Sequence, residues 1–237
     1  IKGFWSALTS FDYDRDGDLD LVLGGYGLNS KIRASVDRPI TMLINDFDDN
    51  EDNDHLLLYY IEDEQYLFHT KDELVSQMPF LKKKVLSYKD FSEADWRSLF
   101  DPKKIKESQL LEVTENRSSV FINQGENGFV PQPLPSSVQL SPVSDILISD
   151  VDADNIEDLV LTGNFHETNI QMGRYDASYG EVLLNKDSKM VPVAQRKTGL
   201  NLVGQVRNSE ILLFKGEKVY IFGMNNDQLK LYKKVVR

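Results

Sequence analysis

The chain reads DYDRDGDLD over residues 12–20, DFDDNEDND over 46–54 and DVDADNIED over 150–158. Each stretch places an acid or an amide at positions 1, 3 and 5 and closes with an acid at position 9. So many carboxylates in nine residues repel one another unless a cation lies among them. Hard oxygen ligands of this kind select Ca²⁺ over softer metals. We therefore predict that these loops bind two or three calcium ions.

The spacing assigns a role to each loop position. Positions 1, 3, 5 and 9 supply side-chain oxygens, and position 7 supplies a backbone carbonyl. Position 6 must turn sharply, which favours glycine because glycine reaches positive φ without strain. Gly17 meets this need, Asn155 is the next most tolerated residue, and Glu51 is a poor one. The predicted metal-site residues are Asp12, Asp14, Asp16, Asp18, Asp20, Asp46, Asp48, Asn50, Asp52, Asp54, Asp150, Asp152, Asp154, Ile156 and Asp158.

The three loops are not expected to bind equally well. The middle loop has Asn50 in place of an acid and Glu51 at the sharp turn. A left-handed turn at a residue other than glycine costs about 1 kcal/mol. We expect the first and third loops to bind calcium better than the middle one, and whether the middle loop binds metal at all stays open.

An EF-hand shares the D-x-[DN]-x-[DN] opening of these loops. It also needs a bidentate Glu at position 12, where this chain has Leu23, Leu57 and Leu161. The flanking segments are short apolar or β-prone runs bounded by turn residues, which indicate strands rather than long helices. Each loop is therefore predicted to join two strands of a hairpin, with the acid at position 9 opening the second strand.

The charge of the chain is concentrated in the same loops. They hold 16 of the 38 acids and one base, Arg15, whereas the remaining chain has 22 acids and 26 bases. An acidic chain without a basic stripe argues against nucleic acid as the main partner. No apolar run approaches the ~20 residues needed to cross a bilayer. The absence of cysteine removes disulfides, zinc–thiolate sites and thiol catalysis.

The loops and their flanks also resemble a known repeat. The unit Φ-x-D-x-D-x-[DN]-x-x-x-D-[LH]-[VL]-L is similar to the FG-GAP or VCBS repeat of integrin-α-like β-propellers, and its strongest matches are residues 10–25 and 149–163. Residues 27–29, 33–35, 45–48 and 173–180 resemble parts of large bacterial VCBS-repeat proteins. The resemblance covers roughly residues 1–62 and 116–195, and it is weak over 65–115 and the last 40 residues.

The resemblance implies an all-β fold of about four β-propeller blades, as a partial or small propeller. It implies mainly structural calcium and a propeller that serves as a binding platform. We accordingly expect a calcium-binding module of an exported bacterial protein, extracellular, at the cell surface or periplasmic, that acts in adhesion by binding a protein or glycan. The start at Ile1, without Met or a signal-peptide pattern, indicates a piece of a larger chain.

Residues 1–237 are predicted to form a single propeller-like domain or fragment with a helical insertion near 70–110. Capping boxes are predicted at Thr70–Glu73 and Ser92–Asp95, and Asp101 precedes Pro102 at a first helical position. The insertion carries Phe80, Leu81, Trp96 and Phe100, which are expected to pack it onto the blades. Whether it also binds a ligand, as insertions on one face of a repeat protein often do, stays open.

No catalytic motif accompanies the acidic loops. The three histidines, His55, His69 and His166, form no H-E-x-x-H arrangement, and the chain has no G-x-S-x-G elbow or P-loop. We do not expect an enzyme, because bound metal would keep the loop aspartates ionised and leave no general acid. Two alternatives stay open: a polysaccharide-acting hydrolase or lyase with structural calcium, and an accessory domain that only holds its neighbours. The aromatic segment with Phe165, Arg174, Tyr175 and Tyr179 is expected either to bind a ligand or to be buried.

Overall fold

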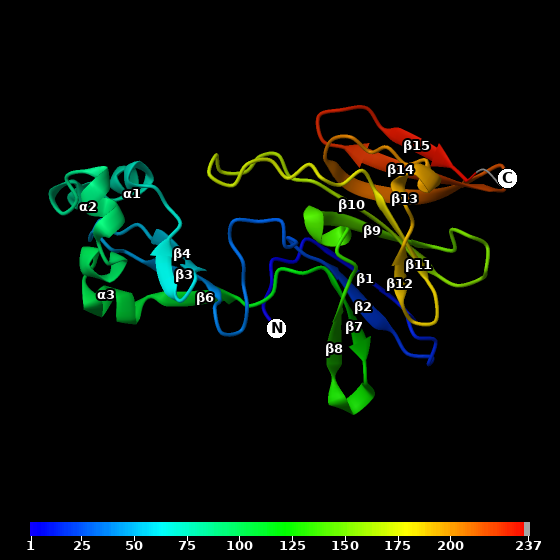
Figure 1. The fold of residues 1–237 in the computed structure, drawn as a ribbon, viewed down its shortest axis with the longest axis horizontal. Coiled ribbons are helices and arrows are strands. Elements are labelled where there is room, and N and C mark those ends of the chain that lie inside the picture. The colour runs from blue at the N-terminus through cyan, green and yellow to red at the C-terminus, as the bar shows by residue number, and fades with distance from the viewer. Residues whose placement is uncertain (235–237) are drawn as a thin grey trace. The chain divides into compact units, whose positions relative to one another are not determined.

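The computed structural model describes residues 1–234, which are mostly β, with four antiparallel sheets and a few short helices (Figure 1). This confirms the predicted β character of the chain, although no closed sheet forms among the described residues. The chain divides into two compact units, where the sequence suggests one domain with a shorter insertion. The inserted unit contains Ile1–Gly3 and Ile32–Glu115, and the main unit contains Phe4–Lys31 and the residues from Asn116 on.

The main unit holds three of the sheets, and all neighbouring strands in them are antiparallel. The first sheet has the order β1 (Ala7–Phe11), β2 (Asp20–Gly24), β7 (Ser119–Asn123), β8 (Phe129–Pro133). The second has the order β9 (Val143–Ser149), β10 (Asp158–Gly163), β11 (Glu181–Asn185), β12 (Met190–Pro192). The third consists of β13 (Val206–Phe214), β14 (Glu217–Met224) and β15 (Lys230–Lys233). Short helical turns are η3 (Gly125–Asn127), η4 (Val138–Leu140) and α4 (Gln195–Thr198).

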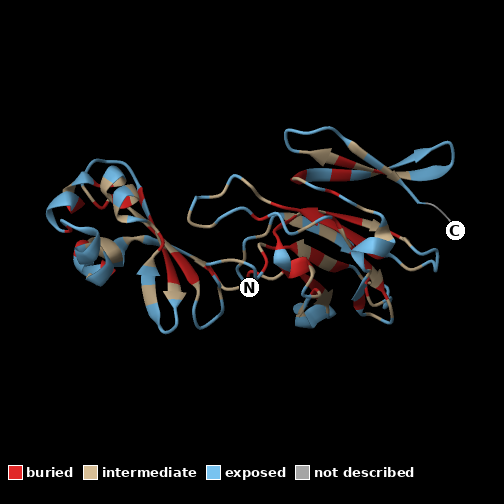
Figure 2. Ribbon diagram, turned by 45° about the horizontal axis from the view of Figure 1, so that its top comes forward, coloured by how far each residue is buried: buried red, intermediate tan, exposed pale blue. Residues whose placement is uncertain are grey.

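Strand β10 of the second sheet is buried at every residue, and buried positions concentrate on the strands of the molecule in Figure 2. Leu159 and Leu161 of β10 belong to an apolar cluster that includes Phe11 and Val22 of the first sheet. Val160, which points the other way, belongs to a cluster with Phe222 of the third sheet. This explains the continuous apolar run of β10, because a strand covered on both faces needs no polar side.

Glycine ends the second strand of this sheet because another backbone passes close by. A Cβ at Gly163 would lie 1.8 Å from the carbonyl oxygen of Pro142, so no larger residue fits. In the first sheet, a Cβ at Gly25 would lie 2.6 Å from the carbonyl oxygen of Asn116. The glycines after β2 and in β10 therefore serve backbone packing.

The inserted unit combines the fourth sheet with the longer helical segment. The sheet has the order β5 (Glu64–Leu67), β4 (Asp54–Ile61), β3 (Ile40–Asn45), β6 (Gln109–Val113). The helices, which all lie in the predicted segment 70–110, are α1 (Lys71–Gln77), η1 (Pro79–Lys83), α2 (Tyr88–Glu93), η2 (Trp96–Leu99) and α3 (Pro102–Glu107). Leu81, Trp96 and Phe100 are buried in one cluster with Leu56 and Leu58 of β4, so the helices pack on this sheet.

Two of the three predicted helix starts are confirmed. Thr70 and Glu73 form the capping box of α1, and Asp101 caps α3 with Pro102 at its first position. The predicted box at residues 92–95 is wrong, because Ser87 and Asp90 already form the box that opens α2. Asp95 instead caps the short helix η2. No helix in residues 1–234 has the length and apolar character to span a membrane.

Candidate metal centres

Each acidic loop joins two neighbouring antiparallel strands, as predicted. The first loop (12–20) follows β1, the middle loop (46–54) follows β3 and the third loop (150–158) follows β9. In each loop the aspartates at positions 1, 3 and 9 place carboxylate oxygens within 4.8 Å of one another. These triads can hold a metal ion, and they are Asp12, Asp14 and Asp20; Asp46, Asp48 and Asp54; and Asp150, Asp152 and Asp158.

All three loops turn through left-handed residues at the same two positions. At position 6, φ is 99° for Gly17, 73° for Glu51 and 63° for Asn155, which confirms the predicted sharp turn. Position 4 is also left-handed, with φ near 60° at Arg15, Asp49 and Ala153, and the sequence pattern does not predict this. The paired reversals direct backbone N–H groups toward the side chains at positions 1 and 5.

The position-1 carboxylate organises the turn in each loop. Asp12 accepts a hydrogen bond from the backbone N–H at position 6 at 3.2 Å. Asp46 accepts hydrogen bonds from the N–H groups at positions 5 and 6, at 3.1 and 2.9 Å. Asp150 accepts three, from positions 4, 5 and 6, at 2.6, 3.2 and 3.0 Å. Each loop therefore holds its first predicted ligand in place through its own backbone.

The position-5 side chains also close the turn. Asp16, Asn50 and Asp154 each accept a hydrogen bond from the N–H at position 7, at 3.0, 2.7 and 2.9 Å. Each of the two aspartates has a second oxygen that takes no part in the turn, whereas the single oxygen of Asn50 would have to serve both the turn and a cation. Of the predicted position-7 residues, Asp18 and Ile156 are partly buried, and Asp52 is exposed. The positions predicted as ligands thus comprise the triad at 1, 3 and 9, the turn-closing residue at position 5, and the residue at position 7 whose N–H donates to it.

The position-9 aspartate is buried in every loop and fixes the loop to its surroundings. Asp20 accepts hydrogen bonds from the backbone N–H groups of Tyr13 at 2.8 Å and Asn123 at 2.7 Å. Asp158 makes the same two contacts, with the N–H groups of Val151 at 2.8 Å and Asn185 at 2.9 Å. Asn123 and Asn185 end the third strands of their sheets, so each aspartate joins a loop to a neighbouring hairpin.

In the middle loop a helix replaces that hairpin. Asp54 accepts the N–H of Phe47 at 2.9 Å, but its other oxygen accepts the side-chain amide of Gln77 in α1 at 3.0 Å. Burial raises the pKa of Asp54 and likewise that of Asp158. The buried acids therefore need these hydrogen bonds, or a cation, to stay ionised.

The first loop has the largest unmet demand for a cation. The Oδ1 atoms of Asp12, Asp14 and Asp18 are shielded from solvent and have no hydrogen-bond partner among the described residues. Burial and the neighbouring carboxylates raise the pKa values of Asp14 and Asp18. Buried polar atoms are nearly always satisfied by a partner, and convergent carboxylate oxygens are satisfied by a divalent cation. The first loop therefore fits such an ion.

The middle loop fits a cation less completely. Asp48 Oδ1 is its one solvent-shielded carboxylate oxygen without a hydrogen-bond partner in residues 1–234. The backbone N–H of Glu51 is the main reason that the pKa of Asp46 is lowered. Lys104 Nζ lies 2.6 Å from Asp49 Oδ1, at a loop position outside the triad. Part of the charge of this loop is thus balanced from within the inserted unit.

The third loop contains an ammonium group among its predicted ligands. Lys186 Nζ lies 2.6 Å from Asp152 Oδ2 and also contacts Asp154 Oδ2. This ion pair lowers the pKa of Asp154 and raises that of Lys186. No carboxylate oxygen of Asp150 or Asp158 is both solvent-shielded and unpartnered within the described chain, and the exposed Asp152 and Asp154 pair with Lys186. Lys186 is absent from the sequence-based site, and the signal that reveals it is its place next to Asn185, the hairpin residue that binds the closing aspartate.

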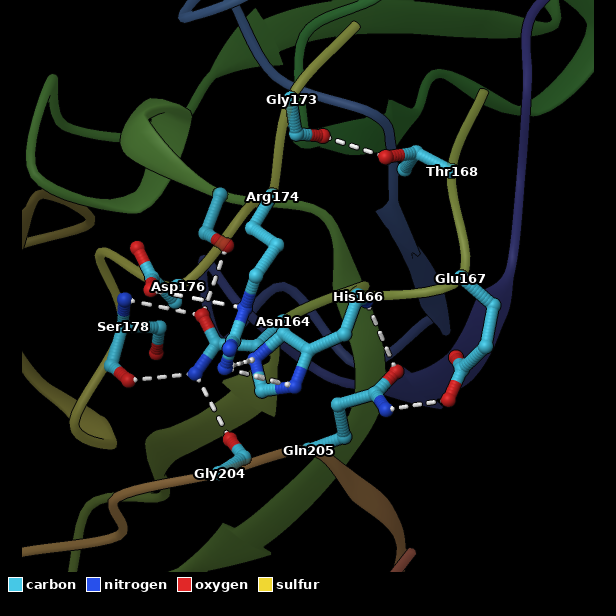
Figure 3. A network of polar contacts seen from close by, with 11 residues as sticks. Asn164, His166, Glu167, Thr168, Gly173, Arg174, Asp176, Ser178, Gly204 and Gln205 are labelled. Atoms are coloured by element: carbon cyan, nitrogen blue, oxygen red, sulfur yellow. Dashed lines mark hydrogen bonds and ion pairs between the residues drawn. The ribbon is translucent and has the colours of Figure 1, made fainter. Parts of the chain in front are cut away.

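The aromatic segment of the main unit is held by a dense polar network (Figure 3). Buried Asn164 donates hydrogen bonds to the carbonyl oxygens of Ser178 and Gly204, both at 2.8 Å. Arg174 Nη2 lies 3.1 Å from Nδ1 of His166. Tyr175 is buried and its ring centroid lies 5.0 Å from that of Tyr26. Of the two roles expected for this segment, the structure favours internal packing for Tyr175.

A groove of about 740 Å³ lies in the inserted unit, lined by residues of β4, β5, α2 and η2. Its aromatic lining includes Tyr66, which is 40% exposed, and the buried Trp96. Its acidic lining residues are Asp63, Glu64, Glu93 and Asp95, and Arg97 is its basic one. The groove has the size of a small-molecule or peptide site and combines apolar faces with charged groups.

Comparison with known proteins adds no relative to this picture. No family model, curated protein or solved structure matches the chain.

Proposed function

We propose that this chain is a calcium-binding β-propeller module of an exported bacterial protein, in which Ca²⁺ rigidifies the hairpin loops and the module binds a protein or glycan in adhesion. The calcium part rests on one observation above the others. Three carboxylate oxygens of the first loop are withdrawn from solvent and left without a partner in the described chain. Hard anionic oxygens at this spacing fit Ca²⁺, and sites of modest affinity suffice outside the cell.

The arrangement of the main unit supports the propeller part of the proposal. Its first strands β1, β9 and β13 follow one another as neighbours, with β9 in contact with both others. The first two sheets are four-stranded antiparallel meanders that carry an acidic loop between their first and second strands. Sheets packed face to face with their first strands innermost are the repeating element of a propeller.

The groove of the inserted unit supports the binding part. Aromatic rings stack on sugar or peptide groups, and the surrounding carboxylates accept hydrogen bonds from them. Tyr66→Ala should weaken binding to a glycan or peptide found by array screening by about ten-fold, the loss expected for one well-placed aromatic contact. Tyr88→Ala, which removes an exposed tyrosine outside the groove lining, is the matched control. Equal binding by both variants would remove the groove from the proposal.

Thermal unfolding with and without calcium tests the central claim. A site whose Kd is one hundredth of the free calcium concentration stabilises the fold by about 2.7 kcal/mol. For a chain of this size, that corresponds to a rise in Tm of roughly 5–10 °C per site. The measurement compares 1 mM CaCl₂, 1 mM MgCl₂ and EDTA at constant ionic strength. An identical Tm in CaCl₂ and EDTA would count decisively against calcium binding.

A further inference from the structure

Lys186 occupies a defined place in the third loop. Its ammonium group contacts Asp152 and Asp154, which are the residues at positions 3 and 5. Both are predicted ligands, and Asp152 also belongs to the triad that can hold a metal ion. Charge-assisted hydrogen bonds of this kind are about twice as strong as neutral ones. A divalent ion that uses these oxygens has to displace the ammonium group or tolerate its repulsion.

The turn that carries Lys186 is held by hydrogen bonds on both sides. Lys186 and Lys189 exchange two backbone hydrogen bonds, at 2.9 and 3.1 Å, which close the turn. Asn185 donates its side-chain amide to the carbonyl oxygen of Tyr13 at 2.8 Å, and the Tyr13 hydroxyl donates to the carbonyl oxygen of Ser188. The turn is therefore held on both sides, so the Lys186 side chain starts from a fixed backbone position.

The first sheet provides a natural counterpart to this arrangement. The strand registers β2–β7 and β10–β11 are equivalent, and the backbone N–H groups of Asn123 and Asn185 bind the closing aspartates of their loops. The residue that follows is Gln124 in one hairpin and Lys186 in the other. The residue after the strand end that binds the first loop, which has three unpartnered oxygens, is thus neutral, whereas the corresponding residue for the third loop is a lysine that pairs with two of its acids.

We propose that Lys186 is a built-in cation of the third loop, which balances Asp152 and Asp154 in the metal-free protein and lowers the calcium affinity of this loop below that of the first. The inference rests on the calcium binding proposed above. It adds that the first loop binds calcium more tightly than the third. In the main unit, the first loop then fills at calcium concentrations that leave the third loop with its lysine.

A reciprocal exchange in the full chain tests this assignment. Lys186→Gln gives the third loop the neutral neighbour of the first, and Gln124→Lys gives the first loop the cation of the third. Lys189→Gln removes the same charge from the same turn and is the control, because Lys189 is exposed. Calcium titration calorimetry should show the third-loop site tightening by about ten-fold in Lys186→Gln, with no change in Lys189→Gln. Gln124→Lys should weaken the tightest site by a similar factor.

Two further measurements separate the possible failures. Adding Asp150→Ala to Lys186→Gln must abolish the gained affinity, since the gain belongs to the third loop. In EDTA, Lys186→Gln should lower the Tm relative to Lys189→Gln, because two carboxylates lose their partner. Calcium binding with equal isotherms for Lys186→Gln and wild type would overturn the inference and leave the proposed function standing. If no variant bound calcium, the proposed function would be overturned, and so would the inferred difference in calcium affinity between the loops. The Tm values in EDTA would still decide whether Lys186 balances the charge of Asp152 and Asp154.

Discussion

The first and third loops lie in neighbouring sheets of the main unit and share their backbone turns, their triads and their buried closing aspartates. They differ in what lies beside them. The first loop faces a hairpin with Gln124 and keeps unpartnered oxygens, whereas the third faces Lys186, which pairs with two of its acids. The comparison teaches that the nine-residue pattern sets the geometry of a loop, while a residue in a distant hairpin sets its charge balance.

Substitution of the closing aspartates should have the largest effect on the free energy of unfolding. It tests whether the two loops, which share their geometry, also depend on these aspartates to the same extent. Asp20→Ala and Asp158→Ala each leave two backbone N–H groups without an acceptor, at about 1–3 kcal/mol per group. We expect a loss of about 3 kcal/mol or more for each, measured by urea unfolding in EDTA.

Asp54→Ala supplies the contrast within this experiment. Its second partner is the Gln77 side chain, which can turn to solvent, so about half the loss is expected. Asp187→Asn, at an exposed acid of the same hairpin as Lys186, controls for removal of a charge, because asparagine tolerates the left-handed backbone at this position (φ 50°). If Asp54→Ala cost as much as Asp20→Ala, the hairpin contact would not be what fixes the loops of the main unit.

Substitution of the position-1 aspartates should have the next largest effect. Comparing each variant with and without calcium isolates the contribution of the metal to stability. Asp12→Ala should remove most of the calcium-dependent stabilisation of its site, about 2–3 kcal/mol. Asp150→Ala should remove less than about 1 kcal/mol of it if Lys186 weakens the third loop. The difference in unfolding free energy between calcium and EDTA, taken for each variant, is the measurement. A larger calcium-dependent loss for Asp150→Ala than for Asp12→Ala would reverse the order of the two loops.

The sequence alone predicts a good part of this molecule. Alternating acids followed by an apolar triplet define where each loop ends and its second strand begins, because the position-9 acid must be buried at the strand start. The left-handed residue at position 6 follows from the same spacing. Thr70 and Asp101 likewise predict where their helices begin, because their capping hydrogen bonds depend on only a few neighbouring residues.

What the sequence does not predict depends on contacts between distant segments. Lys186 lies more than thirty positions from Asp152, so spacing within the loop holds no trace of it. Gln77 reaches Asp54 only because α1 packs beside β4, and Ser87 opens α2 only because its hydrogen bonds prevail over those expected at Ser92. The fourth sheet and the helices form one compact unit, whereas the sequence predicts an insertion of residues 70–110 alone.

Substitutions at position 6 should have a smaller effect on the free energy of unfolding. They extend the comparison to the middle loop. Glu51 has a φ of 73°, so Glu51→Gly should stabilise the protein by about 0.5–1 kcal/mol in EDTA. Gly17→Ala should destabilise it by about 1 kcal/mol, since Gly17 has a φ of 99° and open space where its Cβ would lie. Urea unfolding of both variants checks the signs. A stabilising Gly17→Ala would show that the first loop does not need the left-handed turn.

The smallest expected effect concerns pH and comes from a histidine of the inserted unit that lies outside the acidic loops. Burial lowers the pKa of His69 below its ordinary value of 6.5, and its Nδ1 atom has no hydrogen-bond partner in the described part of the chain. The unfolded chain therefore takes up this proton at a higher pH than the folded protein does. Stability is fully present above pH 6.5 and is lost as the pH falls below it.

His69→Asn should reduce this loss between pH 7.5 and pH 5.5, by less than about 1 kcal/mol because His69 is only partly buried and solvent screens its charge. Urea unfolding at both pH values, in EDTA so that calcium affinity does not enter, measures the difference. The wild type, measured at the same two pH values, is the reference. An unchanged slope in His69→Asn would place the pH dependence elsewhere, and any comparison of the loops across pH would then have to account for that other group.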